Sequence, residues 1–324
     1  MANSPLRLLL TRRWPEAAES RLRGLCDVTA NAQDQQLTTA EWRAAITQFD
    51  IICPTVSDRI APDVFSVPGA RVRLLANFGV GVDHINVPAA KAAGIAVTNT
   101  PGVLTEATAD LALTLILMTS RRAGEGEREL RAANWTGWRP THLMGQELAG
   151  KVLGLVGFGR IAQATASRAR AFGLTIAYHG RRRADCKTEE SFDAEWYESL
   201  ERMATDVDIL SLHCPGGEAT RHLIDAQVLS LMKPTAILIN TARGTVVDEA
   251  ALAKALSEHR IWAAGLDVFE AEPAVSPELM LLDNAVLLPH LGSATIETRT
   301  RMGLCAASNV EAFLNGAELP DRVA

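Results

Sequence analysis

The sequence predicts an α/β protein built from two doubly wound parallel sheets. Short apolar runs of strand length alternate with helical patterns along all 324 residues, which is typical of parallel sheets. Two series of such runs flank one long apolar segment, and this break indicates two domains. With 48% hydrophobic residues, the chain is long enough and apolar enough for two cores of ordinary size.

The first series lies in the first hundred residues. Ala-rich or amphipathic segments, typical of helices, separate its strands, which we predict at residues 6–10, 50–53, 72–76 and 95–98. A long helix is expected next, over residues 104–122, which are apolar at helical spacing. Thr105 stands at its start, where a hydroxyl can cap the first turn. This helix connects the two series.

The second series begins at Lys151 and contains six predicted strands. They cover residues 152–156, 174–178, 207–212, 236–240, 263–268 and 285–288. Six strands at this spacing suit a doubly wound nucleotide-binding domain. A final helix is predicted over residues 294–315, ending at Gly316, and we expect it to return to the first domain.

Composition excludes several classes of partner. The 32 basic and 38 acidic residues are spread along the chain, with short basic runs such as residues 121–122 and 181–183, so we expect no nucleic-acid partner and a small ligand. The longest apolar stretch, residues 111–118, is far shorter than the ~20 residues of a membrane span, so we expect no membrane role. The five cysteines have no paired spacing and no leader precedes the first strand, which favours a reduced, cytoplasmic setting without a metal site.

The turn Gly157-Phe158-Gly159 follows a predicted buried strand and opens an Ala-rich helix. With Ala162 it forms the G-x-G-x-x-A variant of the dinucleotide-binding fingerprint. The first glycine permits a tight turn, the second lets the backbone approach a pyrophosphate, and the alanine allows close packing of helix and sheet. The start of the helix favours phosphate, so we expect Ile161, in its first turn, at the cofactor site as well. Arg160 either contacts the pyrophosphate or simply lies in solvent at the helix end.

A basic turn follows the second strand of this domain. An NAD-selective site should carry a carboxylate there, but the sequence gives His179 and Gly180, followed by Arg181, Arg182 and Arg183. Guanidinium groups suit a 2′-phosphate, so we predict that the first four of these residues bind NADP(H), with NAD(H) as the weaker alternative. The simpler interpretation is a solvated basic turn.

Five further motifs resemble the D-isomer-specific 2-hydroxyacid dehydrogenase family. They lie at residues 77–84, 100–106, 240–244, 265–273 and 289–293, so the resemblance extends over nearly the whole chain. It implies a flavodoxin-like substrate domain (residues 1–101 plus 292–324) and a Rossmann cofactor domain (residues 102–291), joined by two hinges. It also implies hydride transfer between a nicotinamide cofactor and a 2-keto acid.

Three residues suit that chemistry. An always-charged bidentate donor such as Arg243 can hold the substrate carboxylate and polarise its carbonyl. His290 suits the proton donor, and a carboxylate beside it would stabilise its protonated form and fix its tautomer. Glu272 suits this carboxylate, although its neighbour Glu270 could play the same part. The resemblance favours Glu272, which directly precedes Pro273, and assigns the same roles to Arg243 and His290.

The resemblance implies further contacts at the cofactor and the substrate. Thr105, Thr220, Thr241, Ala242, Asp267, Gly292, Ser293 and the segment His213-Cys214-Pro215 are expected on the cofactor together with Arg243 and His290. Val80 and Gly81 are expected to hold the substrate carboxylate through their amide groups, with Val56, Leu143 and Met144 lining the pocket. For each of these the alternative is ordinary loop structure.

The segment Trp135 to Pro140 is similar to glyoxylate and hydroxypyruvate reductases, as is the end of the second strand. In that subgroup the second tryptophan, here Trp138, reaches the substrate site of the partner subunit, which implies a homodimer and a small substrate. Two aromatic residues packed beneath a loop are the alternative. We predict NADPH-dependent reduction of glyoxylate and hydroxypyruvate to D-2-hydroxy acids.

Three other functions compete with this prediction. The first is an NAD-dependent D-2-hydroxyacid dehydrogenase acting on another substrate. The second is formate oxidation, but formate dehydrogenases carry Gln before the active-site His, where this chain has Pro289. The third is a dinucleotide-sensing protein, because transcriptional corepressors of the same family keep the cofactor fold and the catalytic residues.

Overall fold

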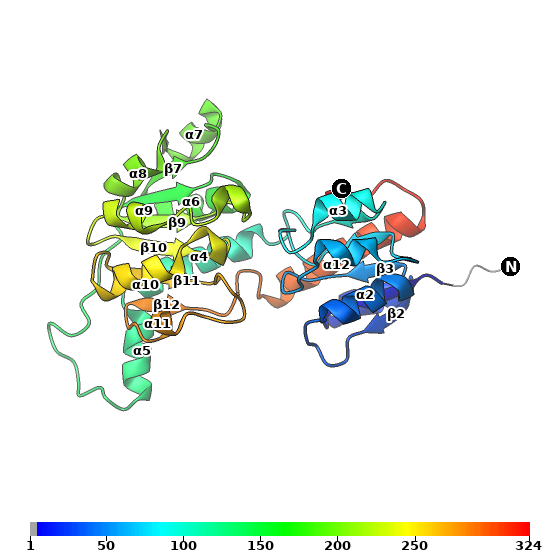
Figure 1. Cartoon of the computed structure of the whole chain (residues 1–324). Coiled ribbons are helices and arrows are strands. Elements are labelled where there is room, and N and C mark those ends of the chain that lie inside the picture. Colours follow the sequence, from blue (N-terminus) through cyan, green and yellow to red (C-terminus); the bar gives the residue numbers. More distant parts are fainter. Residues whose placement is uncertain (1–4) are drawn as a thin grey trace. The chain divides into compact units, whose positions relative to one another are not determined.

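The computed structural model describes residues 5–324. The chain divides into two compact units, the first formed by Met1–Leu104 with Ala294–Ala324 and the second by Thr105–Ser293. Figure 1 shows the first unit in blue, cyan and red and the second mainly in green, yellow and orange. Both units are α/β with parallel sheets, which confirms the predicted fold class.

The first unit contains a five-stranded parallel sheet of order β2-β1-β3-β4-β5. Its strands are β1 (Arg7–Leu10), β2 (Asp27–Ala30), β3 (Ile51–Cys53), β4 (Leu74–Ala76) and β5 (Ala96–Thr98). This order is the flavodoxin-like one, in which the chain winds first to one side of β1 and then to the other. Strand β2, an edge strand without a fully buried residue, was not predicted from the sequence.

Helices cover both faces of this sheet. They are α1 (Glu16–Arg23), α2 (Thr39–Gln48), the short 3-10 helix η1 (Pro62–Ser66), α3 (Val87–Ala92) and α12 (Ile296–Leu314). One core gathers around the fully buried Trp42 of α2, and the other lies beneath α1 and α12. A Cβ added to Gly303 of α12 would lie 2.5 Å from the Cβ of Ala18, so glycine allows α12 to pack closely on α1.

The second unit contains a seven-stranded parallel sheet of order β12-β11-β10-β9-β6-β7-β8. Its strands are β6 (Val152–Val156), β7 (Thr175–His179), β8 (Ala194–Tyr197), β9 (Ile209–Leu212), β10 (Ile237–Asn240), β11 (Ala263–Leu266) and β12 (Ala285–Leu287). The first six strands have the Rossmann order, and β12 extends the sheet. Six of these seven strands were predicted from the sequence, and the edge strand β8 was not.

Two helical layers cover the second sheet. On one face α4 (Thr105–Ser120) packs against α6 (Arg160–Ala171). On the other lie α8 (Leu200–Asp206), α9 (Ala226–Leu231) and α10 (Glu249–Ser257). The remaining short helices are α7 (Cys186–Phe192), η2 (Glu218–Thr220), η3 (Gly244–Val246) and α11 (Pro277–Met280).

Helix α5 (Ala123–Arg131) differs from the other α-helices because none of its residues is buried. It starts after Arg122, which has a left-handed backbone (φ 53°) and separates α5 from α4. Figure 1 shows α5 and the loop after it extending away from the sheet. Over residues 5–324, the structure has no helix with both the length and the apolar character needed to span a membrane.

Candidate active site

The fingerprint turn lies where the winding direction of the second sheet changes. Strand β6 pairs with both β7 and β9, and its carboxyl end leads into Gly157. The Gly157 N–H donates to the carbonyl of His179 at 2.7 Å. Gly157 has φ +90°, and a Cβ there would come within 3.1 Å of the His213 and Cys214 backbone. Only glycine fits this turn without strain.

Gly159 leaves open space at the start of α6. A Cβ built on it would meet no atom within 4 Å, and no side chain caps the helix. The first N–H groups of an uncapped helix, with the positive end of its dipole, form a site for an anion. Ala162 is fully buried against the sheet, whereas Arg160 is exposed and Ile161 is partly buried. The turn therefore fits the pyrophosphate of a dinucleotide.

The basic turn follows the carboxyl end of β7. Arg183 is tied to Glu189 by two hydrogen bonds of 2.9 Å each. Arg181 and Arg182 are exposed, and within residues 5–324 neither makes an ion pair. His179 Nδ1 lies 3.0 Å from the Tyr197 carbonyl, and no carboxylate occupies the turn itself.

The loop after β10 is held by Asn240, a residue without a predicted role. The Asn240 Nδ2 donates to the carbonyl of Arg243, and its Oδ1 accepts the N–H of Ala242. Arg243 in turn donates from Nη1 to the Ala242 carbonyl at 2.7 Å, and its stem packs on Gly216. The hydroxyl of Thr241 is buried and has no hydrogen-bond partner among the described residues. This orphan hydroxyl suits contact with a bound ligand.

His290 and Glu272 form a pair at the same edge of the sheet. The Nδ1 of His290 lies 2.8 Å from Oε2 of Glu272, and the side chains are 32% and 36% exposed. Burial raises the pKa of Glu272, but the hydrogen bond and charge of His290, with smaller contributions from the Phe269 N–H and the Arg243 charge, together outweigh it, so this pKa lies below its ordinary value. Glu272 therefore stays ionised and can stabilise an imidazolium.

The alternative carboxylate, Glu270, is engaged elsewhere. Its Oε1 lies 2.8 Å from His222 Nε2 and 2.9 Å from Arg221 Nη2. Of these two glutamates, only Glu272 is the partner of His290 in this geometry.

Asp267, at the end of β11, holds the backbone around His290. Its two oxygens accept the N–H groups of Leu291 at 2.6 Å and Gly292 at 2.8 Å. Burial raises its pKa, although these two bonds and the charge of His290 act in the opposite direction. The Gly292 carbonyl accepts a hydrogen bond from the Thr108 hydroxyl of α4, a contact that was not predicted from the sequence. His290 itself has a left-handed backbone (φ 55°).

The segment after β9 continues this edge. Burial lowers the pKa of His213 to about 4 and raises that of Cys214 to about 11. The Thr220 hydroxyl donates to the carbonyl of Pro215 at 2.7 Å and so closes the loop. These residues lie next to the fingerprint turn, since Gly157 touches the His213 and Cys214 backbone.

In the first unit, side-chain amides shape the loop predicted to bind a carboxylate. Asn77 Nδ2 donates to the carbonyls of Gly79 and Gly81, and Asn99 donates to that of Val80. In the part of the chain that the structure describes, the N–H groups of Val80 and Gly81 donate no hydrogen bond. These N–H groups could thus receive an anion. Val56, whose Cγ1 lies 2.7 Å from a Cβ built on Gly79, borders the loop.

Other predicted residues lie outside these clusters. Thr105 is the first residue of α4, and Ser293 follows Gly292 with a partly buried side chain. Trp138 is 81% exposed and Met144 58% exposed, on the segment between α5 and β6, and Leu143 lies beside Met144. With that exposure, Trp138 is not packed into a site of its own subunit.

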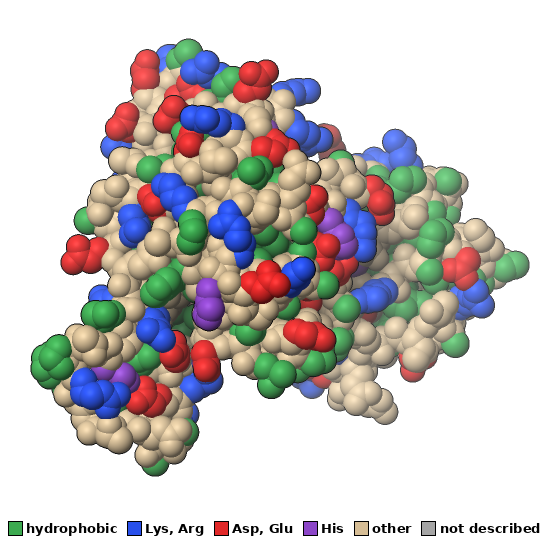
Figure 2. All heavy atoms as spheres, turned by 60° about the vertical axis from the view of Figure 1, so that its left-hand side comes forward, with side chains coloured by type: hydrophobic (Ala, Val, Ile, Leu, Met, Phe, Trp, Pro, Cys, Tyr) green, Lys and Arg blue, Asp and Glu red, His purple; other side chains and the backbone are tan. Residues whose placement is uncertain are grey.

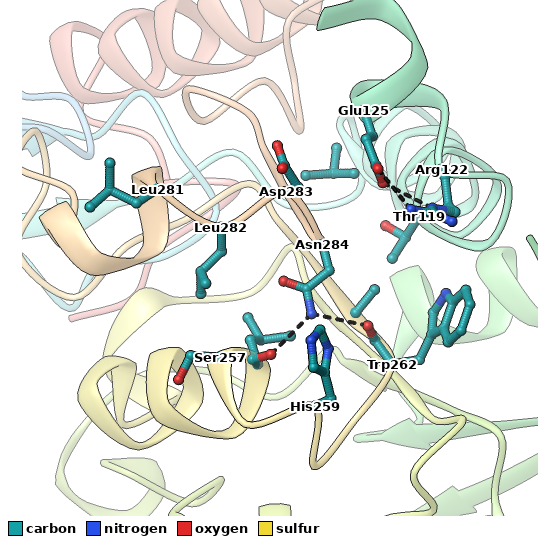
Figure 3. Close-up of a pocket in the computed structure, with 13 residues that line it drawn as sticks. Thr119, Arg122, Glu125, Ser257, His259, Trp262, Leu281, Leu282, Asp283 and Asn284 are labelled. Carbon is teal, nitrogen blue, oxygen red and sulfur yellow. Dashed lines mark hydrogen bonds and ion pairs between the residues drawn. The ribbon is translucent and has the colours of Figure 1, made fainter. Parts of the chain in front are cut away.

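A cavity of about 560 Å³ lies at the amino ends of the strands of the second sheet, away from the carboxyl ends that carry His290. Figure 3 shows that Asn284, before β12, donates to the carbonyls of Leu256 and Trp262, and that Arg122 pairs with Glu125. The cavity thus lies at the amino ends of β11 and β12. Doubly wound sheets bind ligands at the carboxyl ends, so we place the active site at the His290 edge.

Comparisons with known proteins identify the family. Residues 113–292 match the model of the D-isomer specific 2-hydroxyacid dehydrogenase, NAD binding domain. A glyoxylate reductase of Pyrococcus furiosus is 42% identical over 318 residues, which cover 97% of this chain and 94% of the relative. A glycerate dehydrogenase of Hyphomicrobium methylovorum is 35% identical over 316 residues, which cover 98% of this chain and 98% of the relative.

Solved structures agree. An NADPH-dependent glyoxylate/hydroxypyruvate reductase of Sinorhizobium meliloti, in complex with NADP and malonate, has a TM-score of 0.88 and 36% identity, covering 99% of this chain and 97% of its own. A glyoxylate reductase from Paecilomyes thermophila has a TM-score of 0.87 and 30% identity, and the match covers 100% of this chain and 99% of that protein. These matches confirm the family predicted from the sequence. The chain belongs to the D-isomer-specific 2-hydroxyacid dehydrogenases, enzymes that bind a nicotinamide dinucleotide.

Proposed function

We propose that the protein reduces glyoxylate to glycolate and hydroxypyruvate to D-glycerate with NADPH, and that His290 is the proton donor. The observation that carries this proposal is the 2.8 Å pair of His290 and Glu272, at the sheet edge where Arg243 and the fingerprint turn also lie. A carboxylate-supported imidazole is suited to deliver a proton near neutral pH.

The second unit supplies the groups for a dinucleotide. The open helix start at Gly159 suits the pyrophosphate, and the orphan hydroxyl of Thr241 offers a polar contact. Arg181 and Arg182 suit a 2′-phosphate, because both are exposed at the end of β7 and no carboxylate in the turn would repel it. The NADP complex of the Sinorhizobium meliloti relative supports this cofactor.

The side chains divide the reaction between them. A dihydronicotinamide held by the second unit would supply the hydride for the carbonyl carbon. The Arg243 guanidinium holds the substrate carboxylate and polarises the carbonyl. Because Nδ1 of His290 is engaged by Glu272, its Nε2 delivers the proton to the carbonyl oxygen, and Glu272 balances the charge of the imidazolium until then.

The substrate class rests on the relatives and on the first-unit loop. Several of the similar proteins are named glyoxylate reductases. The N–H groups of Val80 and Gly81 fit a substrate carboxylate, and Val56 at the loop suits a small apolar wall.

We further propose that the protein is a homodimer in the cytoplasm. Helix α5 buries none of its residues, and Leu130, Trp135, Trp138 and Met144 on or after it are at least half exposed. Figure 2 shows hydrophobic side chains on the rim of the lobe that projects at the lower left. Such exposed apolar residues favour a subunit interface. The five cysteines are all unpaired, as suits a reducing compartment.

A panel of 2-keto acids at saturating NADPH tests the substrate. We expect kcat/KM for glyoxylate and hydroxypyruvate to exceed that for pyruvate and for phenylglyoxylate at least tenfold. Phenylglyoxylate belongs in the panel because a D-mandelate dehydrogenase of Rhodotorula graminis has a TM-score of 0.88 and 30% identity. Faster turnover of phenylglyoxylate, or no turnover of the two small acids, would refute the assignment.

A further inference from the structure

The buried ring of Tyr178 connects the two phosphate-binding turns of the second unit. Tyr178 is the fourth residue of β7 and is 0% exposed. Its ring stacks on Phe158 of the fingerprint turn, with centroids 4.3 Å apart and planes 20° apart. Phe158 also contacts Phe192 of α7 edge-on, at 5.7 Å. The fingerprint turn therefore rests on the strand that leads into the basic turn.

The hydroxyl of Tyr178 closes the basic turn. It donates to Glu189 Oε1 at 2.5 Å and accepts the N–H of Ala184 at 2.9 Å. Burial, and then the bond to Glu189, raise the pKa of Tyr178 to about 12, so the hydroxyl remains a donor at neutral pH. One buried group thus fixes the backbone just beyond the three arginines.

Arg183 is committed to the same network. Its guanidinium binds Glu189 through Nε and Nη2 and lies over the ring of Trp196, 5.5 Å from the centroid. Hydrogen bonds from Arg183 and then Tyr178 lower the pKa of Glu189, so this carboxylate stays charged and compensates Arg183. Arg181 and Arg182 are left as the cations of the turn, between the end of β7 and the anchored Ala184.

We propose that Tyr178 is a positioning residue for cofactor selection, holding Arg181 and Arg182 in the turn shape that receives a 2′-phosphate. The inference rests on the proposed NADPH preference and assigns its structural cause to a residue that does not touch the cofactor. Loss of the hydroxyl should weaken recognition of the 2′-phosphate while leaving the rest of the dinucleotide site intact, because the ring still supports Phe158.

Calorimetric titration with two fragments of the cofactor separates these effects without any turnover. The probes are 2′,5′-ADP, which carries the 2′-phosphate, and 5′-ADP, which lacks it. The variants are Tyr178→Phe, which keeps the ring stack, and Glu189→Asp, which keeps the charge but is one methylene too short to reach both Tyr178 and Arg183. Tyr197→Phe is the matched control, since Tyr197 is the other tyrosine of the chain and its hydroxyl also binds a carboxylate, that of Asp206.

We expect Tyr178→Phe and Glu189→Asp each to raise the Kd of 2′,5′-ADP about tenfold, equivalent to about 1.4 kcal/mol, and to change the Kd of 5′-ADP less than twofold. Tyr197→Phe should change neither. An equal change for both fragments, or no change for either in the folded variants, would overturn the positioning role. If Tyr178→Phe fails to fold, the two Kd values of Glu189→Asp test the positioning role by themselves. If the wild type itself binds both fragments equally, the NADPH preference fails instead.

Discussion

The Nδ1 of His290 and the Oε2 of Glu272 lie 2.8 Å apart, and this contact orients the imidazole. Glu272 also accepts the N–H of Phe269 at 3.0 Å, so the carboxylate is held from its other oxygen. A fixed carboxylate fixes the tautomer of the histidine and leaves Nε2 for proton transfer. Glu270 contacts Arg221 and His222 instead, which makes it a natural control.

Replacing Glu272 with Gln should lower kcat for glyoxylate reduction about 10²-fold. The amide keeps the shape but not the charge, so the imidazolium loses its partner. Steady-state rates at pH 7 with saturating NADPH measure this loss. Glu270→Gln should retain the wild-type rate; a wild-type rate in Glu272→Gln would contradict the role of the pair.

Replacing Arg243 with Lys should lower kcat/KM for glyoxylate by about 10²–10³-fold, because a point charge cannot hold the carboxylate and the carbonyl together. The Kd of NADPH, measured by fluorescence, should stay within about threefold of the wild type if the guanidinium acts chiefly on the substrate. Arg221→Lys is the matched exposed control. An unchanged kcat/KM, or a loss confined to cofactor binding, would argue against substrate binding by Arg243.

Replacing Gly159 with Ala should raise the Kd of NADPH and that of NADH alike, by about tenfold or more. The new methyl group meets no protein atom within 4 Å, so it enters only the space assigned to the pyrophosphate. The backbone there (φ −80°) suits alanine, and the weaker helix cap should lower Tm by no more than ~3 °C. Unchanged Kd values in the folded variant would place the pyrophosphate elsewhere.

The free energy of unfolding should fall as the pH drops from about 6.5 toward 4. Burial lowers the pKa of His213 to about 4, whereas an unfolded histidine titrates near 6.5. Between these values the unfolded chain binds the extra proton, so acid favours unfolding, by on the order of 1–3 kcal/mol. Urea unfolding of the cofactor-free protein at pH 7.5 and 5 measures this loss in the free energy of unfolding.

His213→Gln should remove that part of the pH dependence, while replacing the exposed His259 should leave it. An equal slope in the His213→Gln variant would show that other groups cause the acid loss.

The central strands of both sheets could be predicted because they are buried on both faces and appear as continuous apolar runs. The edge strands β2 and β8 could not, since their sequences, D-V-T-A and A-E-W-Y, mix polar and apolar residues in half-exposed positions. The helix predicted over residues 104–122 ends at Ser120, close to its expected limit, but the separate helix α5 carried no burial signal.

The site was predictable where one residue type serves one task. The fingerprint glycines follow from backbone geometry, and His290 and Arg243 from their chemistry. The choice between Glu270 and Glu272 needed the fold, because both lie in one short segment and only their contacts distinguish them. The Tyr178 network was not predictable either, since it joins β7, α7 and the fingerprint turn through tertiary contacts alone.

The ratio of kcat/KM for NADPH to that for NADH, with glyoxylate as the fixed substrate, tests the central claim most directly. The two exposed arginines after β7, without a carboxylate in the turn, predict a ratio of at least ten at physiological ionic strength. A ratio of one or less, with glyoxylate reduced at a normal rate, would contradict the proposed NADPH preference.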